Sequence, residues 1–421
     1  MMHLALTLQH VDPARGGAET YVADLCRRLV AAGCRVDLHA ETWRAEALTS
    51  QVNVIPVETF GRTRLERLWS FARESEASLA QCAHDCSVGF INTYAHDVII
   101  PQGGVQAASL LANARRRKRP GARLAYVLAK SANPKLWVQR AIERRQYDPE
   151  RGARVVAVSR MVKRDLETFH HVPPHRIHVV YNAIDPARLA VAHPGASRAA
   201  ARNRLGFAPA DLVALFPGHN HALKGLGPLI EALAERGRLA PSCRPIHVIA
   251  TGDGRGAFRR LAARRGVAGF VHFLGFEDDV RGCYQAADFF AQPTYYDPCS
   301  LVVLEALASG LPVITTMQNG ASELLTDGRE GRILTSPDAQ GELARALDLM
   351  TVDAERLAMA AHARALGARH TLDDHVARLL EVFEEAAVTR RRKSGPRRGH
   401  EASSSAPHFN WSRTAPRSRS D

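Results

Sequence analysis

Residues 295–314 carry the side chains best suited to hold a charged ligand. The stretch reads as a loop, a helix, a glycine turn and a strand, with Asp297 and Ser300 at the helix entrance. A carboxylate or hydroxyl there can cap free backbone N–H groups. Because a helix N-terminus favours anions, the N–H groups of Ser300, Leu301 and Val302 are expected to face a phosphate.

Glu305 follows those donors by about one helical turn and lies between the apolar residues Leu304 and Ala306. Residues three or four apart share one face of a helix, so its side chain can reach the same ligand. An ionised carboxylate only accepts hydrogen bonds, which suits the hydroxyls of a ribose. The alternative is a glutamate that merely points at solvent.

Gly16 and Gly17 follow the first strand-like run and precede a helix-like run. Glycines in such a turn let a phosphate approach the backbone, where the helix N-terminus offers further donors. The pair on its own is common in strand-to-helix turns. It does not complete the Gly-x-Gly-x-x-Gly pattern, so the dinucleotide-binding fingerprint is not satisfied.

These residues belong to a chain of 421 residues in which strand-like and helix-like runs alternate throughout. Such alternation is typical of doubly wound α/β sheets with parallel strands. In the first half we expect strands at 4–11, 35–41, 52–57, 87–91, 98–100, 154–159 and 177–181. Helices are expected at 18–32 and 64–82, followed by a long Arg-rich helical stretch that is interrupted at Pro120-Gly121.

The pattern breaks in an Ala-, Arg- and Pro-rich linker at about residues 185–207 and then resumes. The second half is expected to contain strands at 212–216, 247–250, 271–274, 289–291, 313–315 and 331–334. A helix at 375–387 would close the folded part. Ligands bind at the carboxyl ends of parallel strands, so two such halves facing each other would share a cleft suited to two substrates.

We therefore predict two Rossmann-like domains. The N-terminal, acceptor-side domain covers residues 1–184 with the closing helix 375–387, and the C-terminal, nucleotide-sugar-binding domain covers residues 208–370. Residues 393–421 contain too few apolar side chains to fold and are predicted to be a disordered basic tail.

The stretch 295–314 resembles the signature of the retaining family-4 glycosyltransferases with the GT-B fold. That signature has two glutamates separated by seven residues, followed by small-Leu-Ala-x-Gly-Leu-Pro-Val. Here Asp297 occupies the first acidic place and Glu305 the second. The resemblance implies two Rossmann-like domains facing across an interdomain cleft. The aspartate keeps the charge but shortens the reach by one methylene.

A second resemblance covers residues 218–225, which match the segment that opens the family's C-terminal domain. Lys224 matches a lysine that holds the donor diphosphate, and His219 stands where the family has an arginine. A neutral histidine donates one hydrogen bond instead of a bidentate fork. Members that act on lipopolysaccharide cores also lack this arginine.

Other segments resemble the family in the expected order. Gly252 begins the Gly-x-Gly turn at 252–254, and Phe276 ends the segment 273–276 whose backbone frames the nucleobase. Residues 284–288 match the helix before the donor strand. Residues 179–185 match the interdomain motif, with alanine at position 183 in place of glycine.

In the N-terminal half, His96 and Asp97 stand beside a predicted strand. Family members often use a polar residue there to contact the transferred sugar. Members that act on lipopolysaccharide cores carry an aspartate at this point. The resemblance therefore implies Asp97 as a catalytic candidate, with His96 as second choice.

The implied reaction builds negative charge on a leaving diphosphate, which the enzyme must hold with preorganised donors. The resemblance assigns this to Lys224, His219, the Gly16-Gly17 turn and the helix start, with Asp97 and Asp297 as the other catalytic candidates. A donor phosphate oxygen would act as the base, so no protein nucleophile is named. No Asp-x-Asp motif is present, and we expect neither a metal nor a cofactor.

The net charge of +13 is concentrated in two blocks, of which the second begins at Arg390. The first block consists of five consecutive basic residues, Arg115, Arg116, Arg117, Lys118 and Arg119. Such blocks favour an anionic partner, and we expect all five of these side chains to dock on an anionic membrane surface or on the phosphates of a glycolipid. No helix-turn-helix, zinc-finger or RNP pattern supports nucleic acid as a partner.

The seven cysteines are scattered, which argues against a disulfide framework and for a reducing compartment. Cys82, His84 and Cys86 lack a second pair at zinc spacing, so a buried thiol pair is the preferred interpretation. No apolar run approaches the ~20 residues of a membrane span. We expect a cytoplasmic protein, peripheral on the inner face of the membrane.

The predicted function is the metal-independent, retaining transfer of a hexose from a nucleotide-diphosphate sugar, preferably UDP-linked. The acceptor would be a glycan or glycolipid such as a lipopolysaccharide core. Two alternatives stay open, a nucleotide-sugar 2-epimerase of the same fold and a non-catalytic nucleotide-sugar-binding relative. Conversion of the donor without any acceptor would identify the epimerase.

Overall fold

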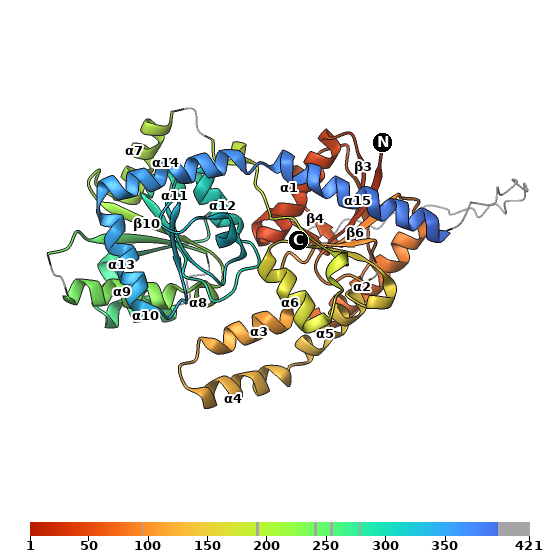
Figure 1. Ribbon diagram of the computed structural model, residues 1–421, viewed down its shortest axis with the longest axis horizontal. Helices are drawn as coiled ribbons and strands as arrows, with labels where there is room; N and C mark the ends of the chain where they lie inside the picture. Colours follow the sequence, from red (N-terminus) through yellow and green to blue (C-terminus); the bar gives the residue numbers. More distant parts are fainter. Residues whose placement is uncertain (95, 191–192, 240–241, 253–255, 278, 395–421) are drawn as a thin grey trace, which may run out of the picture.

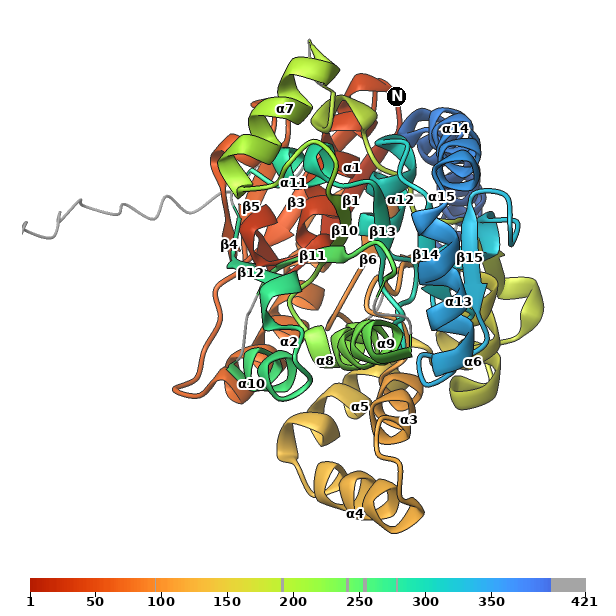
Figure 2. The same cartoon turned by 90° about the vertical axis from the view of Figure 1, so that its left-hand side faces the viewer.

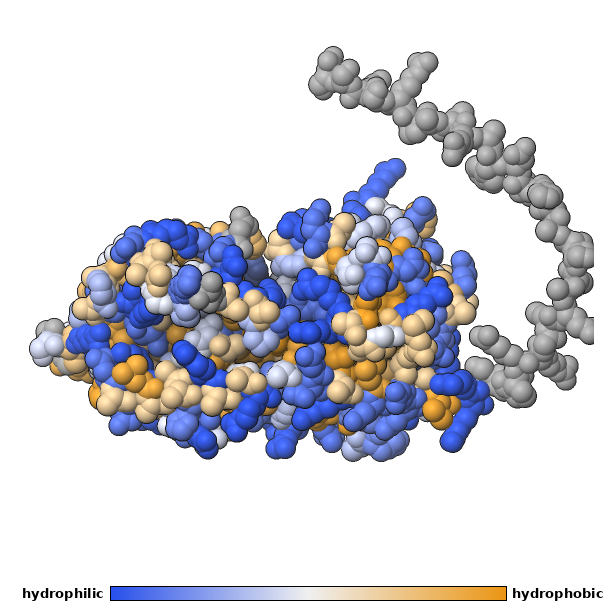
Figure 3. Space-filling view, turned by 90° about the horizontal axis from the view of Figure 1, so that it is seen from above, coloured by the Kyte–Doolittle hydropathy of each residue, from blue (hydrophilic) through white to orange (hydrophobic). Residues whose placement is uncertain are grey.

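The computed structural model consists of two lobes, each built on one parallel β-sheet (Figure 1). It describes every residue except 95, 191–192, 240–241, 253–255, 278 and 395–421. We call the lobe with the N-terminal sheet the N-lobe and the other the C-lobe. Seen from above, the two lobes lie side by side, and hydrophilic and hydrophobic residues are interspersed on the face in view (Figure 3). The expected α/β fold class is confirmed.

The N-lobe sheet has seven strands, and a separate two-stranded sheet lies beside it. The strands of the large sheet are β1 (His3–Thr7), β3 (Arg35–Ala40), β5 (Asn53–Pro56), β6 (Cys86–Gly89), β7 (Val98–Ile99), β8 (Arg154–Ala157) and β9 (Ile177–Val179). Their order is β5-β3-β1-β6-β7-β8-β9, and every pairing is parallel. The small sheet pairs β2 (His10–Val11) with β4 (Thr42–Trp43).

In the described part of the N-terminal half, six α-helices connect these strands. They are α1 (Gly17–Ala31), α2 (Arg64–Gln81), α3 (Gln106–Arg115), α4 (Pro120–Ser131), α5 (Pro134–Gln146) and α6 (Arg160–His170). Short 3-10 turns lie at Pro13–Arg15, Ala45–Ala47, Pro149–Arg151, Pro174–Arg176 and Pro186–Arg188. The hairpin of α3 and α4 projects beneath the C-lobe, and both ribbon views place α4 at its outer side (Figures 1 and 2).

The C-lobe sheet has six parallel strands in the order β12-β11-β10-β13-β14-β15. They are β10 (Leu212–Pro217), β11 (Ile246–Thr251), β12 (Val271–Gly275), β13 (Phe289–Ala291), β14 (Val313–Thr316) and β15 (Gly331–Leu334). All six residues of β10 are buried, as expected for a central strand covered on both faces.

The helices of the second half are α7 (Pro194–Leu205), α8 (His221–Lys224), α9 (Leu226–Leu239), α10 (Gly256–Arg264), α11 (Arg281–Ala286), α12 (Leu301–Ala308), α13 (Gln340–Thr351), α14 (Asp353–Arg369) and α15 (Leu372–Ser394). Two 3-10 turns, Ala268–Phe270 and Gly320–Leu324, complete the set. The last two helices run from the C-lobe back to the N-lobe, where α15 packs on α1 and β6 (Figure 1).

Three segments differ from the sequence prediction. The run 4–11 divides into β1 and β2, which belong to different sheets. The linker at 185–207 contains α7, which packs on α11 because its arginines reach that helix's carbonyls. The Arg-rich stretch forms three helices, and Pro120 starts one of them instead of ending one, as its missing N–H allows in a first turn. Of the predicted tail 393–421, residues 395–421 lie outside the described part.

Asp288, just before β13, joins three elements of the C-lobe. Its carboxylate accepts hydrogen bonds from Arg198 (2.5 Å), from Arg202 (2.7 Å) and from the backbone N–H of Val213 (2.8 Å). The side chain of Arg202 is only 4% exposed. Breaking a buried pair leaves an uncompensated charge, so Asp288 should be a strong stability determinant.

We expect Asp288→Ala to destabilise the C-lobe by about 3–5 kcal/mol, because two arginines lose their common partner. The urea dependence of hydrogen exchange in β10 measures this loss directly. The matched control is Glu231→Ala, which breaks an exposed ion pair with Arg265 and should cost less than about 1 kcal/mol. Equal effects of the two substitutions would contradict the assignment.

Candidate functional site

The loops that leave the C-lobe strands gather at one edge of the sheet, because the strands are parallel. Gly218 follows β10 and Gly252 follows β11. Gly252 has φ +96°, and a Cβ there would lie 2.2 Å from the carbonyl oxygen of Gly218. Only glycine allows this approach of the two loops. The rest of the predicted Gly-x-Gly turn, residues 253 and 254, lies outside the described residues.

Lys224 and Asp297 form an ion pair at this edge, between the end of α8 and the loop after β13. The Asp297 side chain is 9% exposed and that of Lys224 is 22% exposed. The backbone of Asp297 is fixed as well, since its N–H donates to Gln318 (2.9 Å) and its carbonyl accepts from Gly320 (2.8 Å). The structure thus brings two predicted catalytic candidates into direct contact.

The start of α12 lies immediately beyond this pair. Ser300 is the N-cap residue, and its own N–H donates to the side-chain oxygen of Asn319 (3.3 Å). No described side chain caps the helix at this end. The first-turn N–H groups, including those of Leu301 and Val302, can therefore serve an anionic ligand.

The Gly16-Gly17 turn of the N-lobe meets this helix start from the other side. Gly17 is the first residue of α1, and a Cβ at Gly17 would lie 3.3 Å from a methyl carbon of Leu301. Two helix N-termini, one from each lobe, are therefore brought together here. Each carries a partial positive charge, so the gap favours an anion.

Two side chains frame the same region. The rings of His219 and Phe276 stack at a tilt of 22°, with their centroids 6.0 Å apart. Glu19, in the first turn of α1, lies close enough to His219 to interact electrostatically across the lobes. Burial raises the pKa of Glu19, and the charges of Arg15 and His219 oppose that rise.

Glu305 is half-buried, so it is not simply a solvent-facing residue. The hydroxyl of Tyr284 donates to its carboxylate at 2.6 Å. Burial raises the pKa of Glu305, and this hydrogen bond and the charge of Arg188 act in the opposite direction. One carboxylate oxygen is thereby fixed by the protein.

The assignment of Asp97 as a catalytic residue is corrected by its position. Val98 pairs with Val88, so Asp97 lies before β7 at the level of Ser87, away from the carboxyl ends of these strands. Its carboxylate accepts from the N–H and hydroxyl of Ser87 (both 2.8 Å) and from Arg390 (2.8 Å). These contacts tie the sheet to α15, and the second choice, His96, is buried beside Gly89.

The basic block Arg115–Arg119 forms the turn between α3 and α4, apart from the strand-end site. The expectation that all five side chains face an anionic partner is corrected for Arg117, which is partly buried. Its guanidinium lies over the ring of Tyr126, 3.5 Å from the ring centre, and donates to the carbonyl of Asn113 (2.6 Å). Stacking on an aromatic ring satisfies a cation within the protein, so Arg117 fastens α4 to α3.

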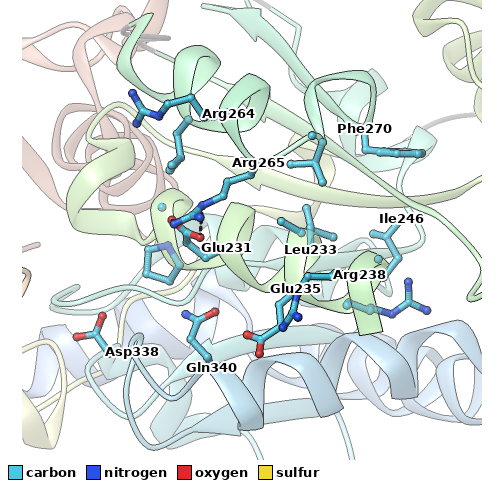
Figure 4. A pocket seen from close by; sticks show the side chains of 18 of the residues that line it. Glu231, Leu233, Glu235, Arg238, Ile246, Arg264, Arg265, Phe270, Asp338 and Gln340 are labelled. Atoms are coloured by element: carbon cyan, nitrogen blue, oxygen red, sulfur yellow. Dashed lines mark hydrogen bonds and ion pairs between the residues drawn. The ribbon is translucent and has the colours of Figure 1, made fainter. Parts of the chain in front are cut away.

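The other basic residues of the block are placed differently. Arg115, Lys118 and Arg119 are exposed. Arg116 and Lys118 border a groove of about 1060 Å³ that also runs along α9 and α10. Figure 4 shows the C-lobe part of this groove, with the Glu231–Arg265 ion pair at its centre and Asp338 and Gln340 along one side. The groove carries both signs of charge.

Two further findings concern metals and membranes. Within the described residues, no three or more His, Cys, Asp or Glu side chains group in a way that could hold a metal ion. Cys82 and Cys86 are free thiols, and His84 contacts the carbonyl of Cys82. No described helix is both long and apolar enough to cross a bilayer.

The sequence analysis missed three residues that the structure places at or beside the site. Glu19 lies in the first turn of α1 beside Gly16, Tyr284 holds Glu305, and Tyr296 joins the Asp297 loop to the N-lobe. An acidic residue in the first turn after a Gly-Gly pair is a local signal that could have identified Glu19. No local signal identifies the partners of the two tyrosines.

Comparisons with known proteins agree with this geometry. Residues 15–188 match the family model described as Glycosyltransferase Family 4, and residues 211–352 match Glycosyl transferases group 1. The D-inositol 3-phosphate glycosyltransferase of Salinispora arenicola is 30% identical over 407 residues, 89% of this chain and 88% of that protein. Other matches span less of the relative, 55% for the same enzyme of Stackebrandtia nassauensis and 60% for the lipopolysaccharide glucosyltransferase WaaG of Escherichia coli.

Solved structures show the same architecture. A crystal structure of WaaG, described as a glycosyltransferase involved in lipopolysaccharide biosynthesis, superposes with a TM-score of 0.75 at 22% identity, covering 90% of this chain and 99% of that one. Anabaena HepE, solved with UDP and glucose, superposes with a TM-score of 0.64 at 19% identity, covering 90% and 100%. With family models matched in both lobes and a relative aligned over most of its length, this chain belongs to the family-4 (group 1) glycosyltransferases of the GT-B fold.

Proposed function

We propose that this chain transfers a hexose, with retention of configuration, from a UDP-linked donor to a glycan or glycolipid acceptor. The observation that carries the proposal is the ion pair of Lys224 and Asp297 beside the uncapped start of α12. The UDP and glucose bound to HepE, and the involvement of WaaG in lipopolysaccharide biosynthesis, support the choice of donor and acceptor class.

The leaving diphosphate would lie between the two helix N-termini. Lys224 supplies a full positive charge, and the N–H groups of Leu301, Val302 and the Gly16-Gly17 turn supply fixed dipoles. Such preorganised donors stabilise charge that develops in the transition state. We propose no metal ion at this site, because Lys224 and these backbone N–H groups would balance the negative charge of the diphosphate.

Asp297 would act by orienting Lys224 and by facing the transferred sugar. Its ion pair keeps the ammonium pointed at the strand-end edge, while the second carboxylate oxygen can accept a sugar hydroxyl. The proposed base is a donor phosphate oxygen.

Glu305 would accept the ribose hydroxyls with the oxygen that Tyr284 does not hold. Ionised carboxylates make strong hydrogen bonds to hydroxyls. His219 and Phe276 would frame the rest of the nucleotide, since both side chains are exposed at the same edge.

The α3–α4 hairpin is proposed to dock on an anionic membrane surface at the cytoplasmic face, where a glycolipid acceptor would lie. Residues 101–142 contain nine basic residues (115–119, Arg123, Lys130, Lys135 and Arg140) and no acidic residue. Leu124 and Leu128 of α4 are both more than 60% exposed. Exposed leucines on a basic helix suit the interface of an anionic bilayer.

We expect UDP to raise the melting temperature of the wild type, and Lys224→Ala or Glu305→Ala to abolish most of this shift. A ligand at a hundred times its Kd stabilises a protein by about 2.7 kcal/mol. A panel of nucleotides and nucleotide sugars in a thermal-shift assay measures it. The control is Lys163→Ala, which removes a lysine of α6 that contacts Glu167 at 3.9 Å. No shift with any nucleotide would refute the donor site.

We also expect vesicle binding to weaken when glutamine replaces Arg115, Arg116, Lys118 and Arg119. Arg117 is kept in this variant because it holds the hairpin together. Each basic residue near an anionic surface contributes about 1 kcal/mol. Sedimentation with phosphatidylglycerol vesicles measures the loss, while UDP binding stays intact. Leu124→Gln with Leu128→Gln separates the apolar contribution from the charge. Unchanged sedimentation of the four-residue variant would refute membrane docking by this block.

A further inference from the structure

The loop that carries Asp297 is held by the opposite lobe as well as by its own. On either side of Asp297, three neighbouring residues contact the N-lobe, one through its side chain and two through their backbone carbonyls. These contacts are the phenol of Tyr296, the carbonyl of Pro298 and the carbonyl of Cys299.

The phenol of Tyr296 makes the most extensive contact. Its oxygen donates to the carboxylate of Asp165 in α6 (2.9 Å) and accepts from the backbone N–H of Val105 (3.2 Å). Tyr296 is 6% exposed, and its ring packs with Ala112 and Met161 of the N-lobe. Burial raises the pKa of Tyr296 far above its usual range, so the phenol stays protonated and donates at all ordinary pH values.

The two carbonyls continue the same interface. Ser159, the N-cap of α6, donates its hydroxyl to the carbonyl of Pro298 (2.7 Å). Asn182, which is 2% exposed, donates to the carbonyl of Cys299 (3.1 Å) and exchanges two hydrogen bonds with Gln102. A loop held at three points so close together retains little freedom.

Two glycines show how closely the lobes approach here. Gly104 has φ +69°, and a Cβ there would lie 2.4 Å from the Tyr296 oxygen. A Cβ at Gly320 would lie 1.8 Å from the carbonyl oxygen of Pro298 and 2.4 Å from the hydroxyl oxygen of Ser159. Any larger residue would push the loop away from the N-lobe.

Glu323 fastens the neighbouring turn to the same helix. Its carboxylate accepts from the N–H groups of Arg160 and Met161 at the start of α6 (both 2.8 Å) and from the hydroxyl of Tyr181 (2.9 Å). Gly320, in the same turn, donates to the carbonyl of Asp297. The turn therefore links the start of α6 to the backbone of Asp297, so a shift of α6 would displace Asp297.

We infer that Asp165 of the N-lobe and Tyr296 of the C-lobe are positioning residues for the reaction, which fix the exact position of the Asp297 carboxylate when the lobes are in contact. This inference rests on the proposed function. The ribose and base of the donor nucleotide would bind to Glu305, His219 and Phe276 of the C-lobe, which would hold them independently of this contact. The transfer step would depend on it, because a displacement of about 1 Å at a reacting group can lower the rate ~10²-fold.

The test compares Tyr296→Phe and Asp165→Asn with the matched control Tyr295→Phe. Tyr295 is the adjacent residue, and its hydroxyl donates to Asp338 within the C-lobe (2.6 Å). The reaction assay follows UDP release from UDP-glucose, and calorimetry gives the Kd of UDP. Hydrogen exchange of the Val105 amide reports the lobe contact without any ligand.

We expect Tyr296→Phe and Asp165→Asn to lower kcat at least about tenfold while the Kd of UDP stays within about twofold. The double variant should be no worse than Tyr296→Phe alone, since Tyr296→Phe already removes the hydrogen bond to Asp165. Tyr295→Phe should change neither quantity. Val105 exchange should rise in Tyr296→Phe alone among the three.

Retained turnover in Tyr296→Phe, with wild-type turnover present, would overturn this inference and leave the proposed function standing. A parallel loss of kcat and UDP affinity would also overturn it, because that result indicates general disruption of the C-lobe. A wild-type chain that neither binds UDP nor releases it from UDP-glucose would overturn the proposed function and this inference together.

Discussion

The direction of the strands governs the location of the site. Every strand of both large sheets is parallel to its neighbours, so all loops that follow strands emerge at one edge of each sheet. Lys224, Asp297 and the start of α12 meet at that edge of the C-lobe, and the Gly16-Gly17 turn approaches it from the N-lobe. A helix N-terminus from each lobe then faces the same gap. The cationic character of this gap follows from backbone geometry before any charged side chain is counted.

The interface between the lobes contains polar contacts as well as apolar ones. One apolar cluster extends from the N-lobe sheet into one face of the C-lobe sheet, while a second cluster fills the other face. Apolar packing alone is tolerant of small shifts, whereas hydrogen bonds specify distance and angle. The bonds that Asp165, Ser159 and Asn182 form with residues on either side of Asp297 therefore define where it lies.

Charge is distributed differently on the α3–α4 hairpin, which is proposed to dock on a membrane, and at the strand-end site, which is proposed to bind the donor. Residues 101–142 carry only basic charge, and most of them belong to the α3–α4 hairpin that projects from the N-lobe. The strand-end site instead pairs its charges, with Asp297 beside Lys224. Surface charge of one sign attracts anionic surfaces over a distance of about one Debye length, whereas paired charge acts only on groups in contact. Docking and chemistry can thus reside on different elements of one chain.

The sequence by itself determined the alternation of strands and helices, and it also determined that Ser300, Leu301 and Val302 begin a helix after an acidic loop. Both follow from local periodicity and capping. It also identified Lys224, whose contact with Asp297 the structure shows.

Only the tertiary structure decided that Asp97 lies before its strand and binds Arg390, and that Arg117 stacks on Tyr126 instead of being exposed like Arg115, Lys118 and Arg119. It alone also showed that Tyr296 reaches Asp165, 131 positions away. Such contacts depend on strand register, on how helices pack and on how the two lobes meet, and none of these is encoded within a local window of residues.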